Sequence, residues 1–184
     1  MLTRSQVKEA QQRAIEMCRK AQIALRQDEM DNMEVVDEGL NDLYHTGLQI
    51  VTYVNTERVC AKEIIMFPRQ TCPQHLHPVV GDYMGKEETF RCRWGTVYLY
   101  VEGEPVENPK AVPPAGTEQY YTVWHEIVLY PGDQYTLSPN TLHWFQAGDE
   151  GAIVSEFSTK SMDETDILTD PNIERITKIC EDTI

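Results

Sequence analysis

The chain has 184 residues, which is long enough for one substantial hydrophobic core and gives no reason to expect more than one domain, residues 1–184. Its formal net charge at pH 7 is -14 and its Lys and Arg residues form no cluster, which argues against a nucleic-acid partner. Hydrophobic residues make up 41% of the chain, without an apolar run of membrane-spanning length or a secretory signal at its start. We therefore expect a cytoplasmic globular protein without a membrane partner.

The five cysteines form an odd set without a Cys-x-x-Cys pair. Such a set argues against a disulfide framework and is typical of free thiols in a reducing compartment.

The first 46 residues are expected to form a helical extension. Thr3 and Gln6 have the spacing of a capping box, and small or apolar residues follow at intervals of three and four. This pattern predicts an amphipathic helix over residues 4–27. Residues 31–47 contain at most one or two further helical turns, bracketed by glycines.

Residues 48–160 consist of short runs rich in β-branched and aromatic residues, such as LQIVTYVN, GTVYLYVEG and GAIVSEFST. Pro, Gly, Asn or Asp separate these runs, as is typical of a barrel or sandwich of many strands. The prolines between 105 and 114 predict a surface loop between two strands.

After Pro171, three apolar residues recur with helical spacing, namely Ile173, Ile176 and Cys180. This spacing predicts a C-terminal helix over about residues 171–181. The expected fold class is therefore mainly β, with α-helices flanking the β core at both ends.

His75 and His77 are separated by one residue. In an extended strand both imidazoles project from the same face, so they can bind one metal ion together. A single His-x-His pair is weak support for a metal site. Isolated histidines more often lie in a core or at a rim, with their hydrogen bonds satisfied within the protein.

The residues that follow the histidine pair strengthen the prediction of a metal site. Glu88, Gly95, a Pro-Gly-Asp turn at 131–133 and His143 follow in an order that resembles the two motifs of the cupin family. The resemblance implies a double-stranded β-helix (jelly-roll) barrel and four metal ligands, His75, His77, Glu88 and His143. The ten residues between His77 and Glu88 exceed the usual spacing, which suggests a particular subfamily.

A ligand set of three imidazoles and one carboxylate, without a thiolate, suits manganese, iron, cobalt, nickel or zinc. Mn²⁺ is the first expectation. Cys72 offers an alternative zinc site, but no second cysteine lies near it in the sequence.

Three further stretches resemble the D-lyxose ketol-isomerase family of metal-dependent cupins. They are QIVTYVNTERVCAKEIIMFPRQTCPQHLHP, the Lys86-Glu87-Glu88 placement and the ending VSEFSTKSMDETD. The resemblance implies interconversion of a free aldose and its ketose, D-lyxose with D-xylulose or D-mannose with D-fructose, usually with Mn²⁺.

Aldose–ketose isomerisation moves a proton between C1 and C2 and therefore needs a base beside a Lewis acid. Lys86 lies two residues before Glu88, so in one strand it would point toward the same interior and stabilise developing negative charge. Glu156 lies within an apolar strand-like run and is the candidate general base. The alternatives are a solvated lysine at the barrel mouth and an outward-facing glutamate. The acidic run of Asp163, Glu164 and Asp166 is expected to be a solvated loop rather than part of the site.

Other functions stay open at this point. The same set of metal ligands is compatible with a cupin dioxygenase or oxidase. It is also compatible with a non-catalytic cupin that only binds a sugar. Arg91 and Arg93 lie near Glu88 in the sequence and could bind a phosphate, so a phosphosugar isomerase is a further alternative. Exposed barrel edges and the amphipathic helix favour a homodimer.

Overall fold

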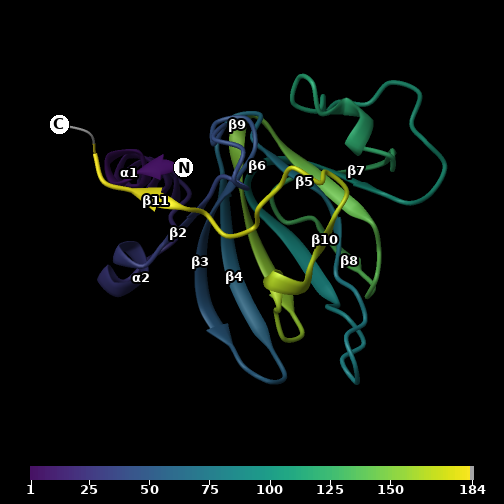
Figure 1. Ribbon diagram of the computed structural model, residues 1–184, viewed down its shortest axis with the longest axis horizontal. Helices are drawn as coiled ribbons and strands as arrows, with labels where there is room; N and C mark the ends of the chain where they lie inside the picture. Colours follow the sequence, from purple (N-terminus) through teal and green to yellow (C-terminus); the bar gives the residue numbers. More distant parts are fainter. Residues whose placement is uncertain (183–184) are drawn as a thin grey trace.

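The computed structural model describes residues 1–182 and is mainly β (Figure 1). The helices are α1 (Arg4–Lys20) and α2 (Gln27–Asp31), with single 3₁₀ turns η1 (Glu118–Tyr120) and η2 (Asp163–Thr165). The strands are β1 (Leu2–Thr3), β2 (Glu34–Val36), β3 (Leu48–Asn55), β4 (Cys60–Met66), β5 (Thr71–Leu76), β6 (Glu88–Val101), β7 (His125–Leu129), β8 (Gln134–Leu137), β9 (His143–Ser158), β10 (Ile167–Leu168) and β11 (Ile179–Cys180).

Two long antiparallel strands, β6 and β9, organise the barrel. Strand β9 pairs with β6 along its length, while its first half also pairs with β5 and its second half with β4. Strand β6 pairs in turn with β7 and β8. Because each of these two long strands pairs with several shorter strands, the nine-stranded sheet curls on itself. The cupin fold expected from the motifs is confirmed.

The glycine of the first motif marks a bend in β6. Gly95 has a φ of 72°, and a Cβ at this position would collide with the carbonyl of Gly151 on β9. The β6–β9 register shifts on both sides of this glycine. Only glycine adopts this backbone conformation so close to a second strand without strain, which explains its place in the motif.

Alternate residues of the strands serve two separate cores. On β4, Ile64 packs inside the barrel with residues such as Phe90 and Phe145. The next residue, Ile65, packs outside the barrel in the cluster that contains the buried face of α1. Strand periodicity thus gives the barrel an apolar interior and an outer face that α1 covers.

The capping box predicted at Thr3 and Gln6 is present at the start of α1. The helix ends at Lys20 rather than near residue 27, because Gln22 adopts a left-handed backbone with a φ of 59°. The chain then forms the short helix α2 and the strand β2. Residues 38–47 contain turns around Glu38 and Asn41, which also have positive φ values.

The predicted C-terminal helix over residues 171–181 is wrong within the described residues. Ile176 and Ile179 are 75% and 52% exposed, so the helical spacing had no apolar surface to pack against. Residues 161–180, here called the C-terminal strap, instead run across the barrel in an irregular path (Figure 1). The strap adds β10 to β5 and ends in β11, which pairs in parallel with β1.

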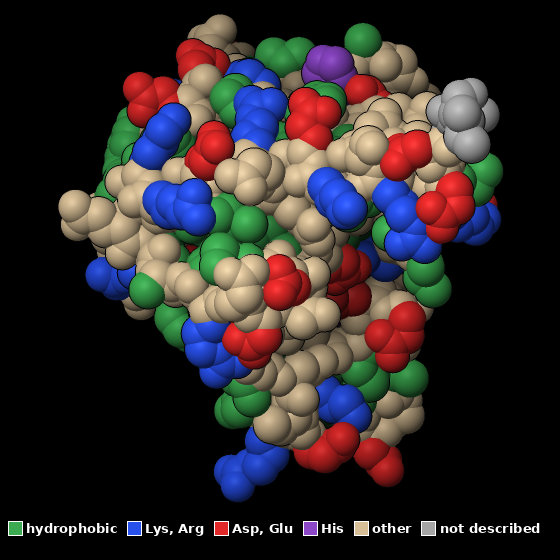
Figure 2. Space-filling view, turned by 90° about the vertical axis from the view of Figure 1, so that its left-hand side faces the viewer, with side chains coloured by type: hydrophobic (Ala, Val, Ile, Leu, Met, Phe, Trp, Pro, Cys, Tyr) green, Lys and Arg blue, Asp and Glu red, His purple; other side chains and the backbone are tan. Residues whose placement is uncertain are grey.

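The proline-rich segment between β6 and β7 forms the predicted loop, in which η1 is a single helical turn. No helix in the described part of the chain has both the length and the apolar character needed to cross a bilayer. Figure 2 shows acidic and basic side chains interspersed on one face of the molecule, so the net negative charge does not collect there as a single-sign patch.

Candidate active site

A cavity inside the barrel brings together the polar side chains singled out in the sequence. His75, His77, Lys86, Glu88 and Glu156 all line it, and each is at most 8% exposed. Apolar side chains of the barrel strands complete the wall, among them Leu48, Ile50, Ile64, Phe90 and Phe145.

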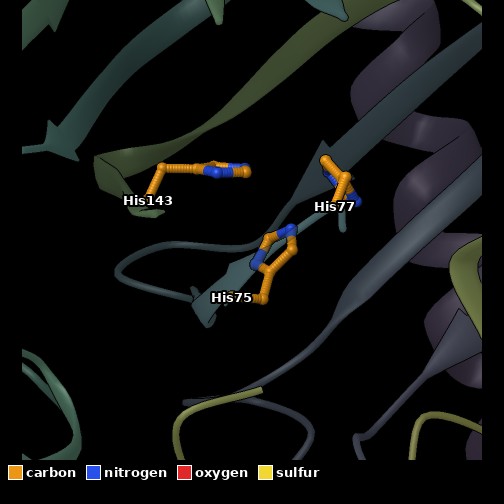
Figure 3. A group of neighbouring side chains, drawn as sticks. All are labelled: His75, His77 and His143. Atoms are coloured by element: carbon orange, nitrogen blue, oxygen red, sulfur yellow. The ribbon is translucent and has the colours of Figure 1, made fainter. Parts of the chain in front are cut away.

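The three candidate histidine ligands converge (Figure 3). The antiparallel register of β5 and β9 places His75 directly opposite His143. His77 lies just beyond the end of β5, and its ring is 4.9 Å from that of His75. One potential ligand atom from each of the three histidines lies within 4.8 Å of the others. Strand spacing and strand pairing therefore produce the cluster that the His-x-His pattern predicted.

Each of these histidines has its Nδ1 atom beside an oxygen that can only accept a hydrogen bond. His75 donates to the carbonyl of Pro73 at 2.7 Å and His143 to that of Thr141 at 2.9 Å. His77 donates to the Asp166 carboxylate at 2.5 Å. In His75 and His143 these bonds favour the proton on Nδ1 and leave the Nε2 lone pair available to a metal, as in metal sites with a second layer of hydrogen bonds. In His77 the Nε2 atom also bonds Glu88 at 3.1 Å, so a metal at this atom would replace a proton.

Glu88 completes the cluster. Its Oε1 lies 3.1 Å from Nε2 of His77 and 3.2 Å from Nε2 of His143. The geometry with His143 is not that of a hydrogen bond, so this buried nitrogen has no hydrogen-bond partner among residues 1–182. Three imidazole nitrogens and a carboxylate facing one another form a nitrogen and oxygen donor set of the kind that binds divalent metal ions. The residues therefore fit a divalent metal ion.

The protonation tendencies of the metal-free site point to the same conclusion. Burial lowers the pKa of His75 well below its ordinary value, and the neighbouring histidines lower it further. Burial also acts to lower the pKa of His77, but Glu88 and the hydrogen bonds to Asp166 and Glu88 outweigh it and raise that pKa to about 9. The cluster thus attracts a positive charge at one point even when only protons are available.

Cys72 is not a member of the converging group, which within the described residues contains the three histidines. Burial raises the pKa of the Cys72 thiol well above its ordinary value, which disfavours the thiolate needed for zinc. The structure therefore gives no support to the alternative zinc site.

Lys86 connects Glu88 to Glu156. Its Nζ atom lies 2.7 Å from Oε2 of Glu88 and 3.2 Å from Oε1 of Glu156. Lys86 precedes β6 rather than lying in the strand, yet its side chain points inward as expected. Burial acts to lower its pKa, but the two carboxylates outweigh burial and raise it well above the ordinary value. The lysine is therefore a fixed positive charge.

Glu156 faces the cavity, which decides between the two orientations that the sequence left open. It is 3% exposed and lies on β9 between Lys62 of β4 and Phe90 of β6. Its Oε1 accepts hydrogen bonds from Lys86 and, at 3.0 Å, from Ser158.

Sequence reasoning missed a second buried lysine, Lys62. Its Nζ atom donates to Ser161 and to Asp163, both at 2.8 Å. Burial acts to lower the pKa of Lys62, but Glu156 and Asp163 outweigh it and raise the pKa. The signal was present in the sequence, because a charged residue within the apolar run VCAKEIIMF is costly unless it is paired.

The acidic run of the strap is not simply a solvated loop. Asp166 holds His77, and Asp163 accepts from Lys62 and from Arg175. Only Glu164 of the three is exposed. Arg175 also bonds Glu34 at 3.0 Å, and its side chain lines the cavity.

Other residues considered in the sequence take simpler positions. Phe90 and Phe145 line the cavity, whereas Trp144 stacks on Tyr100 in a separate aromatic cluster. Arg91 and Arg93 are exposed, and neither contributes to the cavity. The argument for a phosphosugar that rested on these two arginines therefore loses its support.

Comparison with known proteins identifies the family. Residues 11–184 match the family model described as D-lyxose isomerase. The chain belongs to the D-lyxose isomerase family. A D-lyxose ketol-isomerase of Thermofilum sp. is 63% identical over 97% of this chain and 99% of its own length. A D-lyxose/D-mannose isomerase of Thermosediminibacter oceani is 64% identical with the same coverage. The protein is thus an enzyme of this isomerase family, and its substrate is a small sugar.

Solved structures show the same fold at low sequence identity. The L-ribose isomerase of Cellulomonas parahominis has a TM-score of 0.80 at 17% identity, with 97% of this chain and 98% of that chain covered. The L-ribose isomerase of Acinetobacter sp. DL28 in complex with L-ribose has a TM-score of 0.77 at 16% identity and the same coverage. This D-lyxose isomerase family member therefore shares its barrel with isomerases of a different sugar.

Proposed function

We propose that the protein is a divalent-metal-dependent ketol-isomerase that interconverts D-lyxose with D-xylulose and D-mannose with D-fructose. Two relatives that are 63% and 64% identical over nearly the whole chain are named for D-lyxose and for D-lyxose and D-mannose. The cavity contains the groups that this chemistry needs, within one barrel interior.

His75, His77, Glu88 and His143 are the proposed metal ligands. Their nitrogen and oxygen donors, without a thiolate, support Mn²⁺ as the first choice. A bound divalent ion would supply Lewis acidity toward the sugar oxygens. Activity as a cytoplasmic homodimer stays a prediction from the sequence.

Glu156 is the proposed general base. Both of its hydrogen bonds from Lys86 and Ser158 reach Oε1, so Oε2 is the atom offered to the substrate. In the aldose, Oε2 takes the proton from C2, the C2–H electron pair forms a C1=C2 double bond, and the electrons of the C1 carbonyl move onto O1. A proton passes from O2 to O1 as the C2 carbonyl forms, and the same carboxyl returns its proton to C1, which yields the ketose without a net change of atoms or electrons.

Lys86 is the proposed electrostatic partner of this transfer. Its charge is held in place by Glu88 and Glu156, so it stabilises negative charge that develops on the substrate without moving. The contact series from Glu156 through Lys86 to Glu88 is the observation that carries the proposal, because it connects the proposed base to a proposed metal ligand.

The decisive experiment is an anaerobic assay of protein stripped of metal and then resupplied with Mn²⁺. D-lyxose and D-mannose are offered separately in D₂O, with ketose formation and deuterium incorporation measured. We expect ketose that carries deuterium, and only in the presence of metal. D-mannose 6-phosphate and an oxygen electrode provide two comparison arms. Preference for the phosphorylated sugar, or oxygen uptake without ketose, would reject the proposal.

A further inference from the structure

Glu38 is a buried carboxyl group that the chemistry above does not use. It follows β2 in the sequence, is 3% exposed, and lines the same cavity as His75 and Glu156. Its Oε2 atom is buried and has no hydrogen-bond partner within residues 1–182. A buried carboxylate oxygen without a partner destabilises a protein, so its retention calls for an explanation.

The backbone at Glu38 is strained and firmly held. Its φ is 54°, a left-handed conformation that is unfavourable for a residue with a long side chain. The Glu38 carbonyl accepts a hydrogen bond from the Glu174 amide of the strap at 2.9 Å. The preceding Asp37 is fully buried and accepts from the Gly39 amide at 3.1 Å. The turn therefore directs the Glu38 side chain into the cavity at a cost in stability.

The charged groups around Glu38 do not offset the free energy lost through its strained backbone and its buried, unpaired oxygen. Burial raises the pKa of Glu38 to about 7, and Asp166, Glu34 and Asp37 raise it as well, against the effect of Arg175. Strained backbone and unpaired buried groups together are typical of ligand-binding positions. A sugar hydroxyl suits such a group, because it both donates and accepts and so pairs with either form of the carboxyl.

We propose that Glu38 is a substrate-binding residue that hydrogen-bonds a hydroxyl group of an uncharged sugar and discriminates between sugars by the position of that hydroxyl. This inference rests on the proposed isomerase function.

The test compares Mn²⁺-loaded wild type with Glu38→Gly, Glu38→Gln and Asp37→Asn. Glycine removes the side chain and also relieves the left-handed backbone, so a fold defect is not expected. Asp37→Asn removes the neighbouring buried carboxylate, which is not among the residues lining the cavity. For each protein, KM and kcat are measured with D-lyxose and D-mannose, together with bound manganese and Tm.

We expect Glu38→Gly to keep its manganese and a Tm at or above that of wild type. Its KM should rise at least about tenfold, with a smaller change in kcat, because a hydrogen bond to a charged group is lost. Glu38→Gln should alter the ratio of kcat/KM for the two sugars, and it serves as the second variant if glycine is not tolerated. Asp37→Asn should keep the wild-type KM.

Wild-type KM values in Glu38→Gly and an unchanged sugar preference in Glu38→Gln would overturn the inference while leaving the isomerase function intact. A fall in Tm of Glu38→Gly with an unchanged KM would likewise assign Glu38 a structural role only. If the wild type converts neither sugar, the proposed function fails first and the role of Glu38 fails with it.

Discussion

The two sides of the cavity are built in different ways. On one side, His75, Glu88 and His143 lie on β5, β6 and β9, where paired strands determine their positions. On the other side, Glu38, Asp166 and residues near them lie on turns and on the irregular C-terminal strap. The strand side supplies the candidate metal and proton chemistry, and the strap side reaches it through side-chain contacts.

Two carboxylates of the strap bond side chains of the strand side. Asp166 of the strap holds His77, and Asp163 of the strap holds Lys62 of β4. Substitutions on each side should separate their contributions.

The largest effect is expected on the strand side, at Glu88. Glu88→Gln removes the charge that faces two histidines and leaves the Lys86 ammonium with one carboxylate fewer. We expect loss of both bound manganese and activity, with the metal measured by mass spectrometry after gel filtration. Glu87→Gln is the matched control, because the neighbouring Glu87 is exposed. Metal retained at the wild-type level in Glu88→Gln would remove Glu88 from the ligand set.

Glu156 should separate chemistry from metal binding. Glu156→Gln keeps the shape of the side chain but cannot accept a proton, so kcat should fall about 10²- to 10⁴-fold with manganese retained. Lys86→Ala should also retain the metal and lose turnover. Glu150→Gln, an exposed position on the same strand, should change neither quantity. Full activity in Glu156→Gln would exclude this residue as the base.

A smaller effect is expected where the strap meets the strands. Asp166→Ala removes the acceptor that orients His77, and we expect metal affinity to weaken about 10- to 100-fold. Calorimetry with Mn²⁺ measures this change, and saturating Mn²⁺ should restore much of the activity. The exposed Glu164 provides the control variant Glu164→Gln. Equal affinities in the two variants would show that the strap does not support the metal site.

The smallest expected effect is a pH-dependent change in the free energy of unfolding, caused by Glu38 on the strap side. Because the pKa of Glu38 is about 7 in the fold against an ordinary 4.5, the folded state binds a proton more tightly than the unfolded state. Between these two values the free energy of unfolding therefore falls as pH rises, and above pH 7 the loss is complete. The facing groups Asp166, Glu34 and Asp37 strengthen this effect and Arg175 opposes it.

Glu38→Gln removes this titration. Its Tm advantage over wild type should be larger at pH 8 than at pH 5, measured by differential scanning calorimetry at matched metal content. An advantage that does not vary with pH would contradict the raised pKa.

The contrast between the strand side and the strap side of the cavity also explains which features the sequence could predict. The alternation expected of an extended segment made His75 and His77 a pair, although β5 ends between them at Leu76. The motif order resembled a known family closely enough to add Glu88 and His143. Local patterns also predicted the strands and the capping box of α1. Lys62 was detectable as a charge in an apolar strand, although its partners were not.

The strap side depends on chain segments that meet across long separations in sequence. The Asp37 amide bonds the Thr177 hydroxyl 140 residues away, and Asp166 bonds His77 across 89 residues. Spacing within one segment contains no information about such contacts. The helix predicted for residues 171–181 failed for a related reason, because its periodicity is also compatible with an irregular segment held by its neighbours.

The pairing of β1 with β11 has a practical consequence for engineering. Leu2 and Thr3 anchor the far end of the same strap that carries Asp166. An affinity tag that displaced β1 from β11 would therefore release one end of the segment that holds His77. A circular permutant that joins the two ends and opens the loop between β6 and β7 within its exposed residues 102–110 would keep this anchor intact.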